Sequence, residues 1–328
     1  MMKISIIGDG GWGTANALLL AGYGHEVSVW GPFPDYIEEI VRTRSNPRYL
    51  PGVEIDPRIK WTSDRAEAAR ADVVVLASPS KFYGAVCESF KGLITPETLV
   101  VSLTKGLCEK TSARMSELAK SILGVSRIVV LSGPTHAEEV ARGIPTAIVA
   151  AAENIRDAEE VQRIWSGPLF RVYTSDDPAG VEVGGAVKNV IALAVGASDG
   201  LGFGDNTRAA LITRGLAEIT RFACAYGAKE KTLFGLSGIG DLIVTCTSRH
   251  SRNHSVGERL GKGEKIQDIL ASMSMVAEGV WNAKVIKELS AKNGVDMPIT
   301  NLVYAVCYEN YDVRNAVESL MLRESKKE

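Results

Sequence analysis

The sequence predicts an α/β fold with a doubly wound, mostly parallel sheet, followed by a second, all-helical domain. In the first half, short apolar and β-branched runs alternate with helical patterns, the order typical of a parallel sheet with helices on both faces. After residue 180 helical periodicity continues while strand patterns disappear. The chain has 328 residues, of which 45% are hydrophobic, enough for two domains. We place them at residues 1–180 and 181–328.

The alternation predicts the individual elements in order. The run Val73-Val-Val-Leu76 is wholly apolar, as expected for a strand covered on both faces. The expected strands are residues 3–8, 25–30, 72–77, 99–103 and 128–131, with 147–151 and 170–173 as candidates to complete the sheet. The expected helices are residues 11–21, 35–44 (with Asp35 as N-cap), 110–122, 181–197, 206–226 and much of the stretch from Val276 to the C-terminus.

Composition excludes several classes of partner. The formal net charge is −2, so there is no basic excess to hold nucleic acid or an anionic membrane. The best apolar stretch, residues 190–197, is shorter than the roughly 20 residues of a spanning helix, and the N-terminus does not match a signal peptide. The five cysteines are scattered without a Cys-x-x-Cys pair, as in a reducing compartment. We therefore expect a cytoplasmic protein with neither nucleic-acid nor membrane partners.

Residues 8–13, Gly-Asp-Gly-Gly-Trp-Gly, match the G-x-G-x-x-G pattern between a predicted strand and a predicted helix. The first glycine permits a tight turn, the second lets the backbone approach a pyrophosphate, and the third lets the helix pack against the strand. The start of the helix offers unpaired N–H groups to the phosphates. The segment therefore predicts a Rossmann-like domain that binds NAD(P)H.

The acidic residue that usually follows the second strand is missing. Residues 30–33 read Trp-Gly-Pro-Phe where an Asp or Glu would hold the adenosine ribose. Without that acid, NADPH should be allowed, although no arginine directly follows the strand to favour it. Arg42 and Arg44 are the nearest candidates to reach a 2′-phosphate. The choice between NADH and NADPH stays open.

Two polar segments follow predicted strands, where a doubly wound sheet places its site. Lys105 comes after the strand at residues 99–103, and Ser-Gly-Pro-Thr at 132–135 comes after the strand at 128–131. Thr135 and Glu138 have the spacing of a capping box, so a helix is expected to begin there. Capping and ligand binding by Thr135 are compatible.

The second half holds further candidates. Lys188 is surrounded by small and apolar residues on its predicted helix, so its amino group either extends to solvent or is buried for use. Asp241 follows a glycine-rich stretch, and residues 251–253, Ser-Arg-Asn, offer donors that can hold a phosphate; the alternative is an ordinary polar loop. His250 and His254 have no nearby third ligand, so no metal site is predicted.

Taken together and in this order, the segments resemble the NAD(P)-dependent glycerol-3-phosphate dehydrogenases over nearly the whole chain. The Lys-Asn and Ser-Arg-Asn blocks are the most specific. The matching segments are residues 8–15, Thr104-Lys-Gly-Leu107, Ser132-Gly-Pro-Thr135, Gly184-Gly-Ala-Val-Lys-Asn-Val-Ile-Ala192, Gly238-Ile-Gly-Asp-Leu242, Thr245-Cys246 and Ser251-Arg-Asn253.

The resemblance implies a reaction and the residues that carry it. Lys188 would protonate the ketone oxygen of dihydroxyacetone phosphate as hydride arrives from NAD(P)H, with Lys105 and Asp241 as further catalytic residues. The implied substrate-binding residues are Lys105, Gly133, Thr135, Lys188, Asn189, Asp241, Thr245, Ser251, Arg252 and Asn253. The cofactor-binding residues would be Gly8, Gly10, Gly11, Trp12, Gly13, Lys105, Ala137, Arg252, Val276 and Glu278. The family often has a basic residue or His where this chain has Pro32. This departure weakens the carry-over of a preference for NADPH from the family.

The resemblance also implies a homodimer, a small phosphorylated substrate and a role in supplying glycerol phosphate for phospholipid synthesis. Lys105 and Lys188 are expected to share a pocket, where each makes the other easier to deprotonate. Two alternatives remain: another dehydrogenase with a helical second domain, of the hydroxyacid or hydroxyacyl-CoA type, or a non-catalytic NAD(P) sensor.

Overall fold

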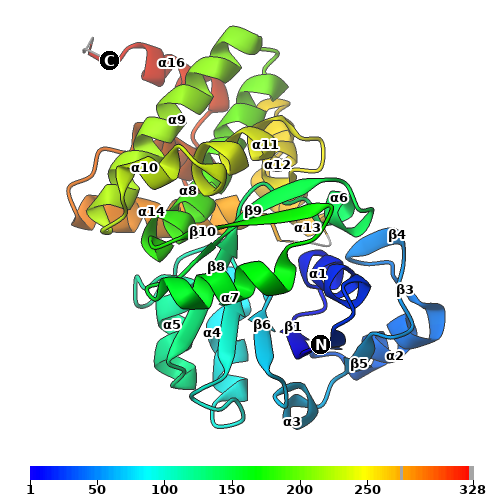
Figure 1. The fold of residues 1–328 in the computed structure, drawn as a ribbon. Helices are drawn as coiled ribbons and strands as arrows, with labels where there is room; N and C mark the ends of the chain where they lie inside the picture. The colour runs from blue at the N-terminus through cyan, green and yellow to red at the C-terminus, as the bar shows by residue number, and fades with distance from the viewer. Residues whose placement is uncertain (274–275, 325–328) are drawn as a thin grey trace. The chain divides into compact units, whose positions relative to one another are not determined.

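The computed structural model describes residues 1–273 and 276–324. It consists of two compact units, Met1–Glu182 and Val183–Glu328 (Figure 1). The division falls inside helix α8 (Pro178–Gly200). Four residues at the C-terminal end of the predicted helical stretch, 325–328, and the pair 274–275 lie outside the described residues.

Unit 1 contains an eight-stranded sheet among its described residues, in the order β10-β9-β8-β7-β6-β1-β2-β5. Neighbouring strands are parallel except for β8 and β9, which pair antiparallel. The mostly parallel sheet of the sequence analysis is therefore confirmed. The strands are β1 (Lys3–Ile7), β2 (Glu26–Trp30), β5 (Lys60–Thr62), β6 (Val73–Leu76), β7 (Leu99–Ser102), β8 (Arg127–Ser132), β9 (Thr146–Ala151) and β10 (Phe170–Ser175).

Helices cover both faces of this sheet. In Figure 1, α1 lies on one side of β1 and β6, while α4 and α5 lie on the other. A short antiparallel ribbon of β3 and β4 follows α2. The remaining elements of unit 1 are α1 (Gly11–Gly22), α2 (Pro34–Thr43), β3 (Ser45–Asn46), β4 (Leu50–Glu54), α3 (Arg65–Ala68), α4 (Ser80–Phe90), α5 (Met115–Leu123), α6 (Ala137–Ala141) and α7 (Ile155–Trp165).

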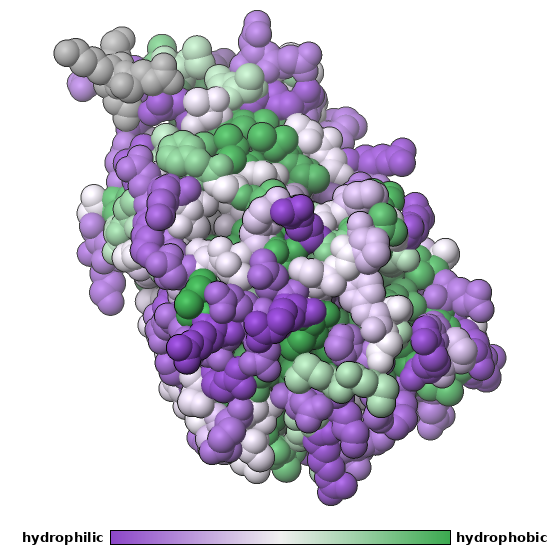
Figure 2. Space-filling view, viewed as in Figure 1, coloured by the Kyte–Doolittle hydropathy of each residue, from purple (hydrophilic) through white to green (hydrophobic). Residues whose placement is uncertain are grey.

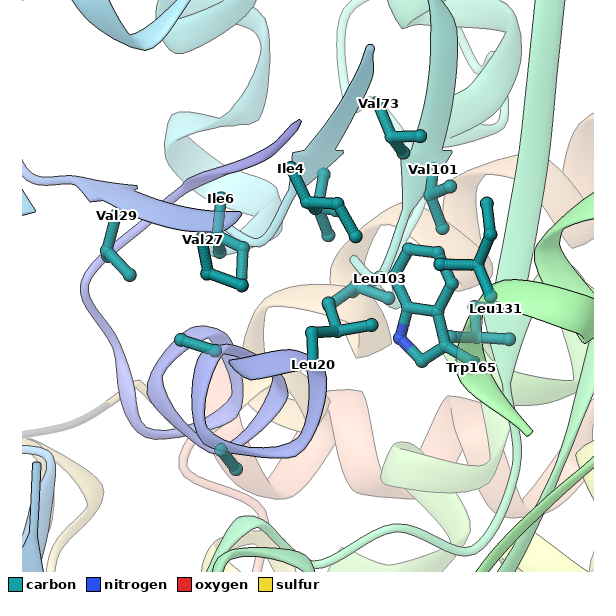
Figure 3. Close-up of a cluster of buried hydrophobic side chains, with 14 of the residues drawn as sticks. Ile4, Ile6, Leu20, Val27, Val29, Val73, Val101, Leu103, Leu131 and Trp165 are labelled. Atoms are coloured by element: carbon teal, nitrogen blue, oxygen red, sulfur yellow. The ribbon is translucent and has the colours of Figure 1, made fainter. Parts of the chain in front are cut away.

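The period of two along the strands explains why the sheet has two cores. Ile4 and Ile6 belong to the buried cluster on the α1 side, whereas Ile7 belongs to the cluster on the α4–α5 side. Figure 3 shows the first cluster, where strand side chains gather around Leu20 of α1 and Trp165 of α7. The continuous apolar runs in the sequence are thus strands buried on both faces.

Unit 2 contains helices and no strand among its described residues, as the sequence predicts. A turn of π-helix (η1) leads directly into α11. The elements after α8 are α9 (Asp205–Ala225), α10 (Glu230–Leu233), η1 (Leu236–Gly240), α11 (Asp241–Thr247), α12 (Arg252–Gly261), α13 (Ile266–Ala271), α14 (Glu278–Lys292), α15 (Pro298–Tyr308) and α16 (Val313–Met321).

Glycines let α8 and α12 pack with their backbones in contact. A Cβ on Gly196 would lie 2.0 Å from the carbonyl oxygen of His254, and one on Gly257 would lie 2.1 Å from that of Leu193. The two helices therefore touch through positions that only glycine can fill. This contact fixes α8, which carries Lys188, against its neighbour in unit 2.

Several predicted helix starts were wrong; α8, for instance, begins at Pro178 rather than at residue 181. The N-cap of α2 is Phe33, because Pro34 occupies the first helical position and Asp35 only follows it. Helix α5 begins at Met115 rather than at residue 110, since an isolated bridge between Leu107 and Arg114 closes the preceding loop. The predicted capping box at Thr135 does not form, because the residue before α6 is His136 and the hydroxyl of Thr135 donates to Gly133.

Helix α8 is also longer than residues 190–197, the best apolar stretch in the sequence. Its length and composition would suffice to cross a membrane, and it is the one such helix among the described residues. However, 89% of the apolar part of this helix is buried inside the protein, as in a core helix. The face in Figure 2 is mainly hydrophilic, with hydrophobic side chains in scattered patches.

Candidate active site

The glycines of residues 8–13 each have the steric surroundings that a dinucleotide-binding turn requires. Gly8 has a φ of 134°, and its amide donates to the carbonyl of Trp30 at the end of β2. A Cβ on Gly13 would lie 2.1 Å from the carbonyl oxygen of Gly8, so α1 packs directly on the turn. By contrast, nothing among the described residues lies within 4 Å of a Cβ on Gly10. The open side at Gly10 fits a closely approaching pyrophosphate.

Residues that the sequence analysis did not single out support this turn. The side chain of Asn46 donates to the carbonyl of Asp9 at 2.7 Å and to the hydroxyl of Thr14 at 2.8 Å. A Cβ on Gly11 would lie 2.4 Å from the carbonyl oxygen of Tyr49, so the β3–β4 ribbon comes down on the start of α1. Asn46 stands in a polar stretch that reads as a loop, and no local pattern reveals its buried role.

Ala137 and Trp12, both predicted to contact the cofactor, also lie near the turn. The Cβ of Ala137 is 3.7 Å from the Cβ position of Gly11, and α6 packs against α1. Trp12 is half-buried against the core cluster on the α1 side. The structure therefore places these two residues around the glycine turn, while their contact with a cofactor stays a prediction.

The neighbouring strands β7 and β8 bring Lys105 to the segment that follows β8. The amino group of Lys105 donates to the carbonyl of Gly133 at 3.0 Å, and the hydroxyl of Thr135 donates to the same carbonyl at 3.1 Å. Gly133 has a φ of 155°, and a Cβ there would lie 3.2 Å from the Cα of Ile148. Three of the predicted substrate-binding residues thus lie together at the carboxyl ends of parallel strands.

Lys188 does not extend to solvent, since only 6% of its side chain is exposed. Its amino group donates to a carboxylate oxygen of Asp241 and to the hydroxyl oxygen of Thr245, at 2.5 Å each. The hydroxyl of Thr245 in turn donates to the backbone carbonyl of Asp241 at 2.6 Å. This arrangement directs a lone pair of Thr245 at the lysine. Of the two readings of Lys188, the buried one is therefore correct.

The segment around η1 explains how Asp241 reaches a lysine 53 positions earlier in the chain. Gly238 packs so closely on α10 that a Cβ would lie 2.0 Å from the carbonyl oxygen of Leu233. Asp241 and Thr245, one turn apart on α11, then point to the same side. Burial raises the pKa of the neighbouring Cys246 thiol to about 12, so this cysteine stays neutral beside the ion pair.

A second group in unit 2 joins three of the predicted segments. The amide of Asn253 donates to the side-chain oxygen of Asn189 at 3.0 Å and accepts from the backbone N–H of Gly279 at 2.8 Å. The guanidinium of Arg252 donates to the carbonyl of Val276 at 3.0 Å. Asn253 is therefore held between α8 and the start of α14, where Glu278 is the first residue.

Ser251 is the N-cap of α12, and its hydroxyl accepts from the amide of His254. Residues 251–253, for which an ordinary polar loop was the alternative, thus form the N-cap and the first turn of a helix. His254 itself pairs with Asp199 at 2.7 Å. The described residues contain no cluster of three His, Cys, Asp or Glu side chains that could hold a metal.

The predicted residues therefore form two sets, each assembled within its own unit. The glycine turn, Ala137, Lys105, Gly133 and Thr135 belong to unit 1, and the lysine cluster with residues 251–253 belongs to unit 2. The pocket that Lys105 and Lys188 were expected to share stays a prediction, as do the individual roles of these residues.

Comparisons with known proteins match both units. Residues 3–158 match the family model for the NAD-dependent glycerol-3-phosphate dehydrogenase N-terminus, and residues 177–318 match the model for the C-terminus. The glycerol-3-phosphate dehydrogenase [NAD(P)+] of Prosthecochloris aestuarii is 47% identical and that of Trichlorobacter lovleyi 48%, covering 100% of this chain and 100% and 99% of the relatives. The crystal structure of glycerol-3-phosphate dehydrogenase from Coxiella burnetii has a TM-score of 0.95 at 38% identity, covering 98% of this chain and 99% of that one.

The glycine turn on a mostly parallel sheet, the helical second unit and the buried lysine define an oxidoreductase that uses NAD(P)H. The full-length matches make the assignment specific: the chain belongs to the NAD-dependent glycerol-3-phosphate dehydrogenase family. The family named by the sequence analysis is thereby confirmed.

Proposed function

We propose that the chain interconverts dihydroxyacetone phosphate and sn-glycerol 3-phosphate, with Lys188 as the group that exchanges the proton. The observation that carries the proposal is the buried Lys188, hydrogen-bonded to Asp241 and Thr245. A carboxylate and a hydroxyl oxygen fix the direction of the amino group, which a proton donor in catalysis requires. In the direction of reduction Lys188 protonates the carbonyl oxygen, and in the direction of oxidation it removes the hydroxyl proton.

The residues of the glycine turn fit NAD(P)H. The open side at Gly10 and the close packing of Gly13 are what a bound pyrophosphate demands of the chain. Gly8, Gly11, Trp12, Ala137 and Lys105, with Arg252, Val276 and Glu278, would hold the cofactor. When bound, NAD(P)H supplies the hydride, and the protein's task is to orient the reactants and to manage one proton.

The substrate phosphate is assigned to residues 251–253. Arginine and asparagine present several N–H donors, and the amide of Asn253 is already fixed by Asn189 and Gly279. Lys105, Gly133 and Thr135 would complete the set with Asn189, Asp241 and Thr245. Asn253 and Arg252 also hold Gly279 and Val276, so the phosphate-binding residues support the segment assigned to the cofactor.

The wider setting follows from the family. We infer that the chain acts in the cytoplasm as a homodimer and provides glycerol phosphate for phospholipid synthesis. The scattered cysteines and the mildly negative net charge support a reducing compartment without nucleic-acid or integral membrane partners.

The test is an absorbance assay at the nicotinamide band, with NADH and with NADPH, against dihydroxyacetone phosphate. We expect turnover with dihydroxyacetone phosphate and at least a hundredfold lower kcat/KM with dihydroxyacetone, which lacks the phosphate. Pyruvate and acetoacetyl-CoA serve as substrates of the alternative hydroxyacid and hydroxyacyl-CoA classes. Preferred turnover of either would overturn the proposal, and tight NADH binding without any oxidation would identify a sensor.

A further inference from the structure

The carboxyl group of Asp9 lies at the end of β2, where the sequence lacks its expected acid. Asp9 follows β1 in the glycine turn, and Gly31 follows the neighbouring strand β2. A Cβ on Gly31 would lie 2.8 Å from Oδ2 of Asp9 and 2.9 Å from its Cγ. The side chains of Asp9 and of Ile37, whose Cδ1 is 2.6 Å from the same Cβ position, therefore fill the space beside Gly31.

This carboxyl group is built into the protein but is only partly satisfied. Asp9 is 8% exposed, and its Oδ2 is buried without a hydrogen-bond partner among the described residues. Its backbone carbonyl accepts from the amide of Asn46 at 2.7 Å, which fixes the backbone that carries this side chain. Buried polar atoms are normally paired, and an exception beside a proposed ligand site points to a role there.

The location matters because adenosine riboses are recognised at the end of the second strand in this fold class. An acid there favours the free 2′-hydroxyl of NADH and repels the 2′-phosphate of NADPH. In this chain, Gly31 and Pro32 contribute neither an acid nor a base at that point. Asp9 provides negative charge at the same end of β2, but from the preceding strand's turn.

We propose that Asp9 sets the nucleotide selectivity of this chain, favouring NADH by placing a carboxylate where the 2′-phosphate of NADPH would bind. The inference rests on the proposed cofactor site at residues 8–13. Direct contact with the ribose is not required, because a buried negative charge is weakly screened and acts over several ångströms.

No arginine among the described residues is hydrogen-bonded to the buried Oδ2 of Asp9. Arg42 and Arg44 lie at the C-terminal end of α2. Arg42 comes nine residues after the N-cap Phe33, a distance of about 14 Å along the helix axis. Arg48 acts electrostatically on Asp9 and opposes the rise that burial causes in its pKa. However, its guanidinium lies over the rings of Tyr36 and Tyr49, at 5.0 and 5.9 Å from their centroids.

The experiment measures binding rather than turnover, with ligands that contain only the adenosine end of the cofactor. ADP-ribose and its 2′-phosphate are titrated into the full chain by calorimetry. We expect the wild type to prefer ADP-ribose, and Asp9→Asn to reduce that preference about tenfold, mainly by binding the 2′-phosphate more tightly. Asp35→Asn is the matched control: it removes one exposed negative charge from the first turn of α2 and should leave the preference unchanged.

Each outcome decides one question. An unchanged preference in a folded Asp9→Asn protein would overturn the inference while leaving the cofactor site intact. If the wild type bound neither ligand, the cofactor site itself would be wrong, and the selectivity with it. If thermal unfolding shows that Asp9→Asn is not folded, Asp9→Ser takes its place, because it removes the same charge with a smaller side chain. The preference of Asp9→Ser for ADP-ribose must then also be lower than that of the wild type.

Discussion

The glycine turn of unit 1 and the lysine cluster of unit 2 prepare their sites by opposite means. At Gly8, Gly10 and Gly13 the chain removes side chains so that backbone can approach backbone, and one side stays open. Around Lys188 it does the reverse and buries a cation against a carboxylate and a hydroxyl. The first site is encoded by a local run of glycines, which Asn46 supports from 37 positions away. The second is made by side chains that are themselves 53 and 57 positions apart in the chain.

The difference determines how each site should fail. A site formed by backbone atoms tolerates many changes in the surrounding side chains, but not a Cβ added where two backbone segments touch. A buried ion pair depends on both partners, because removing one leaves the other in a poorly solvated place. Mutations should therefore separate binding from stability at the glycine turn, and should couple stability to turnover at the lysine.

The largest expected effect is that of Lys188→Met, which keeps the length of the side chain but removes its charge and its proton. We expect kcat for dihydroxyacetone phosphate reduction to fall by about 10² to 10⁴, the usual contribution of a positioned acid or base. NADH binding, measured by fluorescence titration, should stay within about twofold of the wild type, since the glycine turn is untouched.

A double variant separates the chemical role of Lys188 from its structural one. Lys188→Met removes the hydrogen-bonded cation from Asp241, so it should also lower the melting temperature. Lys188→Met with Asp241→Asn removes both charges and should recover much of that loss but no turnover. Recovery of turnover in the double variant would show that Lys188 serves only to neutralise Asp241.

The same contrast explains what the sequence could predict. The glycine turn and the apolar strands are local patterns, and the structure confirms them almost residue for residue. The burial of Lys188 could not be decided locally, because its partner Asp241 lies beyond two intervening helices and a π-helical turn. The predicted helix starts at Asp35 and Thr135 were wrong because of neighbouring residues. Pro34 takes the first helical position before Asp35, and the hydroxyl of Thr135 donates to the carbonyl of Gly133 instead of capping a helix. Asp9 and Asn46 act through contacts that no spacing rule describes.

A second buried ionisable side chain, Glu218, tests how burial changes the pKa of a group and the pH dependence of stability. Glu218 of α9 is 1% exposed, and its carboxylate accepts from the amides of Ile299 and Thr300 at the start of α15. Burial raises the pKa of Glu218 to about 7, so between about pH 4.5 and 7 the folded protein holds a proton that the unfolded chain releases. This stabilisation, about 3 kcal/mol at full size, is present at low pH and is lost as pH rises through 7.

We therefore expect the unfolding free energy of the wild type to decline relative to that of Glu218→Gln between about pH 4.5 and 7. Chemical unfolding at each pH measures it. Glu288→Gln, at an exposed position of α14, is the control and should run parallel to the wild type. If the curves of wild type and Glu218→Gln were parallel as well, the proton would not be held at Glu218.

The smallest effect, and the most specific, is expected from Gly10→Ala. The φ and ψ of Gly10, −66° and 171°, suit any residue, and its Cβ would meet nothing within 4 Å among the described residues. The melting temperature should therefore hold, while the new methyl group weakens NADH binding about tenfold by keeping the pyrophosphate from the backbone. Gly22→Ala is the matched control, since its Cβ also meets nothing within 4 Å but lies at the other end of α1. Because both substitutions add the same group to open space on one helix, unaltered NADH binding by Gly10→Ala would mean that the dinucleotide does not lie over this turn.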